Sequence, residues 1–272
     1  MTNYAGYMGK VIRLDLGSRS VSEYPWTDRD RQLYLGGKAM ASKIMYDNFT
    51  GSEKPLEPEN IIVISTGPLT GTGAPSSSRF NISTLSPQTG ITTSSNCGGN
   101  FGHYLKKAGY DALIISGKCE KLTRVEIHND IIKIHDAEEL KGLCTTPTQE
   151  SIQQKLDEER GCEVKCGKVV IGPAGENLVK YASVFSNERA AGRAGVGCVF
   201  GSKNLKGIAV SGTHEVSIYD PQKTHKLFEK WVETLKKHPL TGNQLPKMGT
   251  AGLVTTMQMR GLLPTRNYAK GQ

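Results

Sequence analysis

The stretch Asp111-Ala112-Leu113-Ile114-Ile115-Ser116-Gly117 returns 95 residues later as Lys206-Gly207-Ile208-Ala209-Val210-Ser211-Gly212. Each stretch is an apolar run of the length expected for a buried strand, and each ends in Ser-Gly. Matching features precede both stretches in the same order: a hairpin, a helix, a strand ending in Gly-Pro, a glycine-rich run and a Phe-Gly pair. The Gly-Pro pairs are 105 residues apart and the Phe-Gly pairs 99. Because this offset is steady and longer than the repeat of a solenoid, it predicts a duplicated α+β unit.

The two copies span roughly residues 1–118 and 122–213, and we expect them to form one pseudo-twofold domain over residues 1–213. In the first copy the pattern predicts a hairpin at 10–24, a helix with Asp28 as its N-cap, and strands at 61–65, 79–84 and 111–117. In the second copy it predicts a hairpin at 124–135, a helix at 148–159, and strands at 168–173 and 206–212.

The character of the chain changes after Thr213. Asp220 followed by Pro221 is typical of a helix start, with Asp220 as the N-cap and Pro221 at the first helical position. The helix would carry Leu227, Trp231 and Leu235 on one face. We therefore expect residues 214–272 to be the beginning of a helical domain.

Composition restricts the class of protein. The chain has 272 residues and a net charge of +8, but its basic residues are scattered and form only pairs such as Lys106-Lys107. A nucleic-acid-binding protein would concentrate them in a patch, so a phosphate-rich cofactor or an acidic partner explains the excess better. No stretch approaches the roughly 18 apolar residues of a membrane span, and the N-terminus has no signal-peptide pattern. We expect a cytoplasmic protein that binds neither nucleic acid nor membrane.

The cysteines and histidines indicate no catalytic or metal centre. Of the six cysteines only Cys162 and Cys166 are close in sequence, and without further ligands at suitable spacing they give weak support for zinc or iron–sulfur. Cys97 has no base near it in the sequence, so a buried small residue is the favoured interpretation. The histidines lack ligand spacing, and no Ser/His/Asp set or carboxylate pair stands out. The catalytic residues remain unknown at this level.

The run Asn187–Gly197 predicts an anion site. It places Arg189 and Arg193 among Ala190, Gly192 and other small residues, which allow backbone N–H groups to approach a ligand closely. Arginine can hold phosphate through two parallel hydrogen bonds, so the run suggests a backbone cradle with guanidinium clamps. It matches neither the dinucleotide fingerprint nor the P-loop. The alternative is a tight turn into a strand with solvent-facing arginines.

The first copy contains a counterpart, Asn96–Gly102, which Arg79 precedes. If a pseudo-twofold axis relates the copies, both glycine-rich runs converge on it. They could then bind two anionic groups of one ligand, or two copies of a ligand. Taken singly, Asn96 would be a turn residue and Arg79 a surface charge.

Several motifs in this order resemble the aldehyde:ferredoxin oxidoreductase family. They are Thr66–Thr72, Gly98–Gly102, Lys107–Asp111, Gly172–Asn177, Arg189–Arg193 and Gly201–Lys206. The resemblance runs from near the first residue to the last and implies two related β-sheets, with flanking helices, that hold two pterins between them. It also implies a tungsten or molybdenum bis-pyranopterin and a [4Fe-4S] cluster.

The resemblance assigns roles by position. Arg79, Asn96 and Gly98 would bind one pterin, and Arg189, Ala190, Gly192 and Arg193 the other. A Mg²⁺ ion bridging the pterin phosphates would take the backbone carbonyls of Asn96 and Ala190, which suits a hard cation. The metal and its dithiolenes would then carry the chemistry while the protein positions them.

The implied reaction is oxidation of a small aldehyde to a carboxylic acid, with electrons leaving through the cluster to ferredoxin or another electron-transfer protein. The family's cluster motif C-x2-C-x3-C and its later helical region are absent from these 272 residues. We therefore expect either a fragment or a subunit completed by another polypeptide, and the resemblance also allows a homodimer. Ala194 replaces a glycine common in the family. The alternative function is a non-catalytic cofactor-binding or assembly module, and a basic nucleic-acid-binding domain is the least favoured.

Overall fold

The first copy of the sequence pattern folds into a six-stranded mixed sheet, with strand order β2-β1-β6-β3-β4-β5. In this computed structural model, which describes residues 4–270, β1 and β6 are parallel and the other neighbours are antiparallel. The strands are β1 (Lys10–Asp15), β2 (Ser20–Glu23), β3 (Ile62–Thr66), β4 (Phe80–Leu85), β5 (Thr92–Cys97) and β6 (Tyr110–Ser116).

The second copy repeats this topology strand for strand, with the order β8-β7-β12-β9-β10-β11 when read from the equivalent edge. Its one parallel pair is β7 with β12, the counterpart of β1 with β6. The strands are β7 (Thr123–His128), β8 (Ile131–Asp136), β9 (Gly167–Val170), β10 (Val184–Ser186), β11 (Arg189–Ala191) and β12 (Leu205–Ser211). The predicted duplicated α+β fold with two sheets and flanking helices is therefore confirmed.

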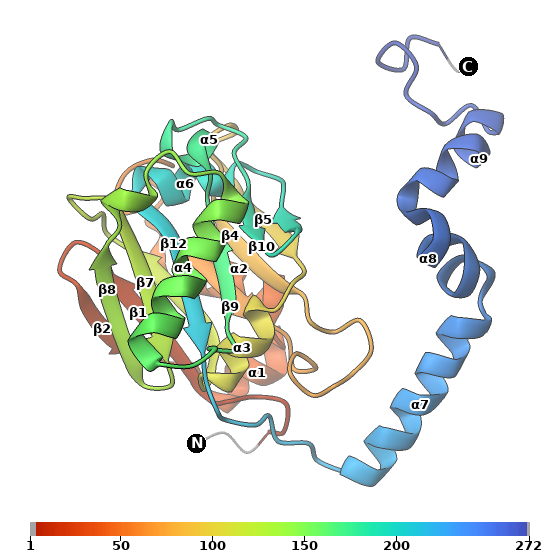
Figure 1. The fold of residues 1–272 in the computed structure, drawn as a ribbon, viewed down its shortest axis with the longest axis horizontal. Helices are drawn as coiled ribbons and strands as arrows, with labels where there is room; N and C mark the ends of the chain where they lie inside the picture. Colours follow the sequence, from red (N-terminus) through yellow and green to blue (C-terminus); the bar gives the residue numbers. More distant parts are fainter. Residues whose placement is uncertain (1–3, 271–272) are drawn as a thin grey trace. The chain divides into compact units, whose positions relative to one another are not determined.

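Helices follow the hairpin and the edge strand in both copies; Figure 1 labels most of these helices. The first copy has α1 (Asp28–Tyr34), α2 (Gly37–Asn48) and α3 (Phe101–Lys107). The second copy has a short 3-10 helix η1 (Glu138–Leu140), α4 (Thr145–Arg160), α5 (Pro173–Glu176) and α6 (Val196–Ser202). The helix α5, between β9 and β10, has no counterpart between β3 and β4.

Two predicted helix starts were wrong by a few residues. Thr27, not Asp28, caps α1: its side chain accepts from the Asp30 backbone, while the Asp30 carboxylate accepts from the Thr27 backbone. The helix α4 begins at Thr145 instead of Thr148. Proline is tolerated at position 147 because the N–H groups of the first helical turn form no intrahelical hydrogen bond, so the lack of one at Pro147 costs nothing.

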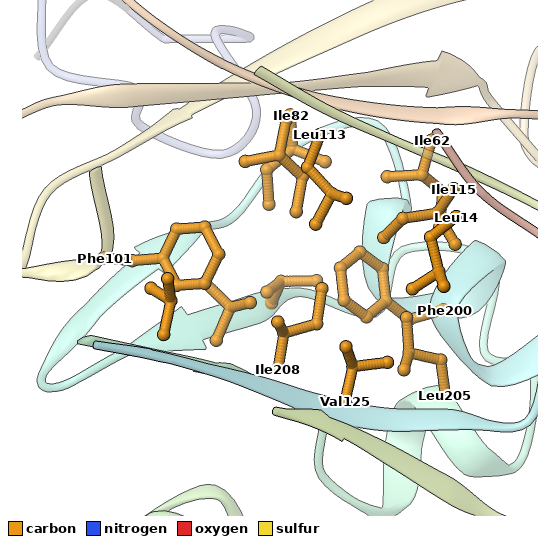
Figure 2. Packing of buried hydrophobic residues seen from close by; sticks show 14 of the residues in the cluster. Leu14, Ile62, Ile82, Phe101, Leu113, Ile115, Val125, Phe200, Leu205 and Ile208 are labelled. Atoms are coloured by element: carbon orange, nitrogen blue, oxygen red, sulfur yellow. The ribbon is translucent and has the colours of Figure 1, made fainter. Parts of the chain in front are cut away.

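The main core lies between the two sheets and draws on both copies (Figure 2). Alternate residues of a strand face opposite sides of the sheet, and the central strands use both faces. In β6, Leu113 and Ile115 belong to the core between the sheets, whereas Ala112 and Ile114 pack with the buried residues of α2. In β12, Ile208 faces the shared core and Ala209 joins the cluster beneath α4.

Three strands escaped the sequence analysis. β5 is rich in threonine, serine and asparagine and forms one edge of the first sheet, so it lacks the apolar alternation of a half-buried strand. β10 and β11 have only three residues each and lie at the corresponding edge of the second sheet. Both edges carry the glycine-rich runs that the sequence analysis singled out.

The chain divides into two units, Met1–Tyr219 and Asp220–Gln272. The second unit begins with α7 (Pro221–Lys237), capped as predicted by Asp220, whose side chain accepts from the Lys223 backbone at 2.9 Å. Short helical segments follow: η2 (Leu240–Gln244), α8 (Leu245–Met248), η3 (Gly249–Leu253) and α9 (Val254–Met259). The proposed domain limits, 1–213 and 214–272, stay predictions. Among residues 4–270, no helix combines the length and apolarity needed to cross a membrane.

Candidate cofactor site

The edge strands β5 and β11, one from each copy, meet in the structure. A Cβ atom added to Gly98 would lie 3.3 Å from Cγ of Arg189, so the Arg189 stem rests on the Gly98 backbone. The Arg193 backbone N–H donates to Ser95 Oγ at 3.2 Å, and the Asn100 N–H donates to Asn187 Oδ1 at 3.4 Å. The two glycine-rich runs are thus brought together from opposite copies, as the pseudo-twofold hypothesis requires.

A hollow of about 660 Å³ opens where these runs meet. It brings together four of the seven predicted cofactor-binding residues. Its lining consists of Ser76, Ser78, Arg79, Gly98, Gly99, Asn100, Glu188, Arg189 and Ala190. One guanidinium comes from each copy, so the hollow has a cationic side chain from each half of the pseudo-twofold unit. Ser76 and Ser78 were not predicted, because nothing distinguishes a loop serine in the sequence, and Glu188 lies in the predicted run Asn187–Gly197 but was assigned no role.

The other three predicted residues lie next to the hollow without lining it. Asn96 is exposed on β5, and its Oδ1 accepts from Nδ2 of the buried Asn81 at 3.0 Å. Gly192 and Arg193 are exposed in the connection between β11 and α6. Asn96 and Ala190, the proposed Mg²⁺ ligands, therefore sit on the two edge strands that meet.

The arginines of the site are available to an anion. Arg79, Arg189 and Arg193 are exposed, and none forms an ion pair within residues 4–270, where the paired arginines are those at positions 19, 31, 124 and 160. Three exposed guanidinium groups around two meeting strands, against one carboxylate, give this part of the surface a positive potential. Glu188 is the one carboxylate that lines the hollow.

Cys97 lies beneath this positive charge as a neutral thiol. Its side chain is 1% exposed, and burial raises its pKa to about 11. The Ser186 backbone N–H and the charges of Arg79 and Arg189 act in the opposite direction but do not overcome burial. The interpretation of Cys97 as a buried small residue is confirmed, since a thiol with this pKa has almost no thiolate at neutral pH.

The glycines of the site are required by close backbone contacts. Gly99 has φ +86°, and a Cβ atom there would lie 2.7 Å from the Ser186 backbone oxygen. Gly195 has φ +70°, and its Cβ atom would lie 2.0 Å from the Lys180 oxygen. A side chain at either glycine would collide with neighbouring backbone, and Gly99 is the one of the two that lines the hollow.

The remaining cysteines lie apart from the hollow. Cys162 is exposed, while the half-buried Cys166 donates from Sγ to Gln153 Oε1 at 3.3 Å. Across residues 4–270, no three His, Cys, Asp or Glu side chains are grouped in a way that could hold a metal ion.

Comparison with known proteins identifies relatives over nearly the whole chain. Residues 11–212 match the sequence model of the family described as "Aldehyde ferredoxin oxidoreductase, N-terminal domain". The tungsten-containing aldehyde ferredoxin oxidoreductases of Pyrococcus furiosus and Thermococcus kodakarensis are 41% and 40% identical over 267 residues. The match covers 98% of this chain and 43% of each relative, so the chain spans less than half of their length.

A solved structure shares the fold. The active-site complex BamBC of benzoyl coenzyme A reductase, solved with 1,5-dienoyl-CoA, superposes with a TM-score of 0.82 at 35% identity, covering 90% of this chain and 36% of the other. A more distant relative, 30% identical, is the WOR-like subunit of the aliphatic sulfonate oxidoreductase of P. furiosus. Together with the duplicated sheets, these matches show that the chain belongs to the aldehyde ferredoxin oxidoreductase family, with residues 11–212 corresponding to its N-terminal domain.

Proposed function

We propose that this chain is the cofactor-binding N-terminal region of a tungsten (or molybdenum) bis-pyranopterin oxidoreductase. The observation that carries the proposal is the meeting of β5 and β11, which places Arg79 and Arg189 around one hollow, neither of them in an ion pair with any residue from 4 to 270. Guanidinium groups in this arrangement suit two phosphate groups approached from opposite copies. The names of the relatives at about 40% identity support tungsten as the metal.

The proposed roles follow from position. Arg79, with the backbone at Asn96 and Gly98, would hold one pterin, and Arg189, Ala190, Gly192 and Arg193 would hold the other. The carbonyl oxygens of Asn96 and Ala190 would bind Mg²⁺ between the phosphates, because backbone oxygens suit a hard cation. When bound, the tungsten or molybdenum group would supply the two-electron redox chemistry, and this chain would supply orientation and positive charge.

For the whole protein we propose oxidation of an aldehyde to a carboxylic acid, with electrons passing through a [4Fe-4S] cluster to ferredoxin. The relatives that are 38 to 41% identical all carry the aldehyde ferredoxin oxidoreductase name. The competing proposal, a non-catalytic cofactor-binding or assembly module, would keep the cofactor but show no aldehyde-dependent reduction of an artificial electron acceptor.

The test is cofactor content in Arg189→Ala and Arg79→Ala variants of the whole protein, grown anaerobically with tungstate or molybdate. Each change removes charge-assisted hydrogen bonds that contribute about 1.5–3 kcal/mol, so we expect pterin and metal per polypeptide to fall roughly tenfold or more. Arg29→Ala, an exposed arginine of α1 away from the hollow, is the matched control and should keep full content. Wild-type protein without tungsten or molybdenum under either condition would contradict the proposal.

A further inference from the structure

The turn that carries Arg189 into the hollow has an unusual backbone. Ser186 and Arg189 are paired residues of β10 and β11, so only Asn187 and Glu188 connect the two strands. Asn187 has φ +54°, a left-handed conformation that asparagine tolerates better than most residues. In a two-residue hairpin loop the polar backbone groups of the first loop residue are not used by the strand ladder, so they need partners from outside.

Gln149 of α4 supplies both partners. Its Oε1 accepts from the Asn187 backbone N–H at 2.7 Å, and its Nε2 donates to the Asn187 carbonyl oxygen at 3.2 Å. The same Nε2 donates to the Thr145 carbonyl at 3.3 Å, which ties the side chain to the first turn of its own helix. Gln149 is 8% exposed, so water competes little for these bonds. The side-chain amide of Gln149 thus forms with the Asn187 backbone the same two hydrogen bonds that a paired residue of a neighbouring strand would form.

The other face of the same turn touches the first copy. Asn187 Oδ1 accepts from the N–H of Asn100, the residue that precedes α3, at 3.4 Å. Two residues further on, the Arg189 stem rests on Gly98. A shift of the turn would therefore move Arg189 off Gly98 and separate the two walls of the hollow.

We propose that Gln149 is a positioning residue of the cofactor site: its side-chain amide fixes the Asn187 turn and so holds Arg189 against Gly98. This inference rests on the proposed function for the identity of the ligand, and on the described contacts for the brace itself. Gln149 is not among the residues that line the hollow, and its hydrogen bonds within residues 4–270 go to Thr145 and Asn187, so its effect on the hollow would be transmitted by the turn. A glutamine on a polar helix gives no sign of this role in the sequence.

The test replaces Gln149 with methionine, which has a similar size and length but cannot form the two bonds to Asn187. Gln154→Met makes the same change at an exposed position of α4, where the side chain bonds only Glu158 within residues 4–270. Pterin and metal content of the whole protein are measured together with hydrogen–deuterium exchange of residues 184–191 and with thermal unfolding. Cofactor content is determined at a temperature at which circular dichroism shows the variant to be folded.

In Gln149→Met we expect cofactor content to fall several-fold and exchange of residues 184–191 to quicken, while β9 and β12 keep wild-type exchange. Gln154→Met should match wild type in both measurements. Full cofactor content in Gln149→Met, or faster exchange spread evenly over the second copy, would overturn the proposal, because Gln149 would then serve only general packing. If wild type and Arg189→Ala contain the same amount of pterin, the proposed function fails, and the exchange of residues 184–191 still decides whether Gln149 braces the turn.

Discussion

Ala194 stands where the family resemblance led us to expect glycine, and its backbone conformation is one that favours glycine. Its φ is +66°, and the next residue, Gly195, has φ +70°. A residue with a Cβ atom in this left-handed region costs about 1–2 kcal/mol relative to glycine. Ala194 is therefore a strained position in the connection that leads from β11 to α6.

We expect Ala194→Gly to raise the free energy of unfolding by about 1 kcal/mol, because the released strain exceeds the extra entropy that glycine gives the unfolded chain. Denaturant unfolding of the two proteins measures the difference. Ala39→Gly, at an exposed position inside α2, is the control and should lower the free energy of unfolding by about 1 kcal/mol. Equal losses in both variants would contradict the strain argument.

Lys203 is a fully buried lysine that forms no ion pair with a carboxylate within residues 4–270. Its Nζ donates to the carbonyl oxygens of Pro58 and Gly117 at 3.0 Å each, so it bridges the second copy to the first. Burial lowers its pKa to about 8, with Asp15 and Glu59 opposing the shift. Between pH 8 and the ordinary lysine pKa of 10.5, the unfolded chain holds a proton that the folded chain has released. Stability from this site must therefore increase as pH rises through that window.

We compare the free energy of unfolding of wild type with that of Lys203→Met. The difference, wild type minus variant, should grow by up to about 3 kcal/mol between pH 7.5 and 10. Using the difference cancels the other groups that titrate over the same range. Denaturant titrations at several pH values give the curve. A difference that stays flat, or that falls with rising pH, would show that the lysine keeps its proton in the folded protein.

At this scale the sequence predicted residues that line the site but not the residues that hold them in place. Arg189 and Ala190 lie in a run of small residues and arginines that was visible in the sequence, whereas Arg79 and Gly98 were assigned through the family resemblance; all four line the hollow. Gln149 and Lys203 gave no such signal. Their partners lie 38 and at least 86 residues away in the chain, and only the folded topology brings them together.

At the scale of elements, the Phe-Gly pair that marked the repeat has a packing explanation in the second copy. Gly201 lies near the end of α6, all of whose residues are buried. A Cβ atom at Gly201 would lie 1.9 Å from the Gly175 oxygen of α5, and one at Gly175 would lie 2.8 Å from the Gly197 oxygen. The helices α5 and α6 therefore pack backbone to backbone, with glycine on both sides.

Gly201→Ala should destabilise the protein by about 3 kcal/mol, because a backbone carbonyl cannot move aside as a flexible side chain can. Gly142→Ala is the control: Gly142 has φ +75° but no atom within 4 Å of its Cβ position, so strain alone should lower stability by about 1 kcal/mol. Thermal or denaturant unfolding compares them. Similar losses of stability for both variants would mean that α5 and α6 can move apart at little cost to accept the added methyl group.

Elements were predictable where apolar pattern and burial coincide. The central strands β3, β6 and β12 are continuous apolar runs, buried on both faces, and were found from sequence. The edge strands β5 and β11 were not, because they are held by one neighbour and by the partner copy instead of by burial of an apolar face. The strands that build the candidate site are thus the ones that the sequence reveals least.

At the scale of the whole first unit, the duplication produces one core and not two. The cluster between the sheets includes Leu14, Ile62 and Ile115 from the first copy, and Val125, Leu205 and Ile208 from the second. The phenylalanines Phe80, Phe101 and Phe200 are all essentially buried within it. Each sheet alone would expose its inner face to water. The two copies should therefore fold as one cooperative structure, although they are consecutive in the sequence.

Phe200 tests this cooperativity, because it comes from α6 of the second copy and lies between the two sheets. Figure 2 shows its ring between Leu14 and Ile115 on one side and Val125 and Leu205 on the other. Replacing a buried phenylalanine with alanine costs about 3–5 kcal/mol through lost transfer energy and a cavity. If the core is shared, this loss must appear equally in both sheets.

We therefore expect Phe200→Ala to lower the opening free energy, measured by native-state hydrogen exchange, by the same amount in β3 and β6 as in β9 and β12. Ile152→Ala is the matched control, because Ile152 packs in the separate cluster beneath α4 and its contacts stay within the second copy. Its variant should open β9 and α4 locally before the first sheet responds. Faster exchange confined to the second copy in Phe200→Ala would mean that the copies are independent. In that case the shared core would not hold β5 and β11 together, and their contact would depend on the direct interactions between the two strands.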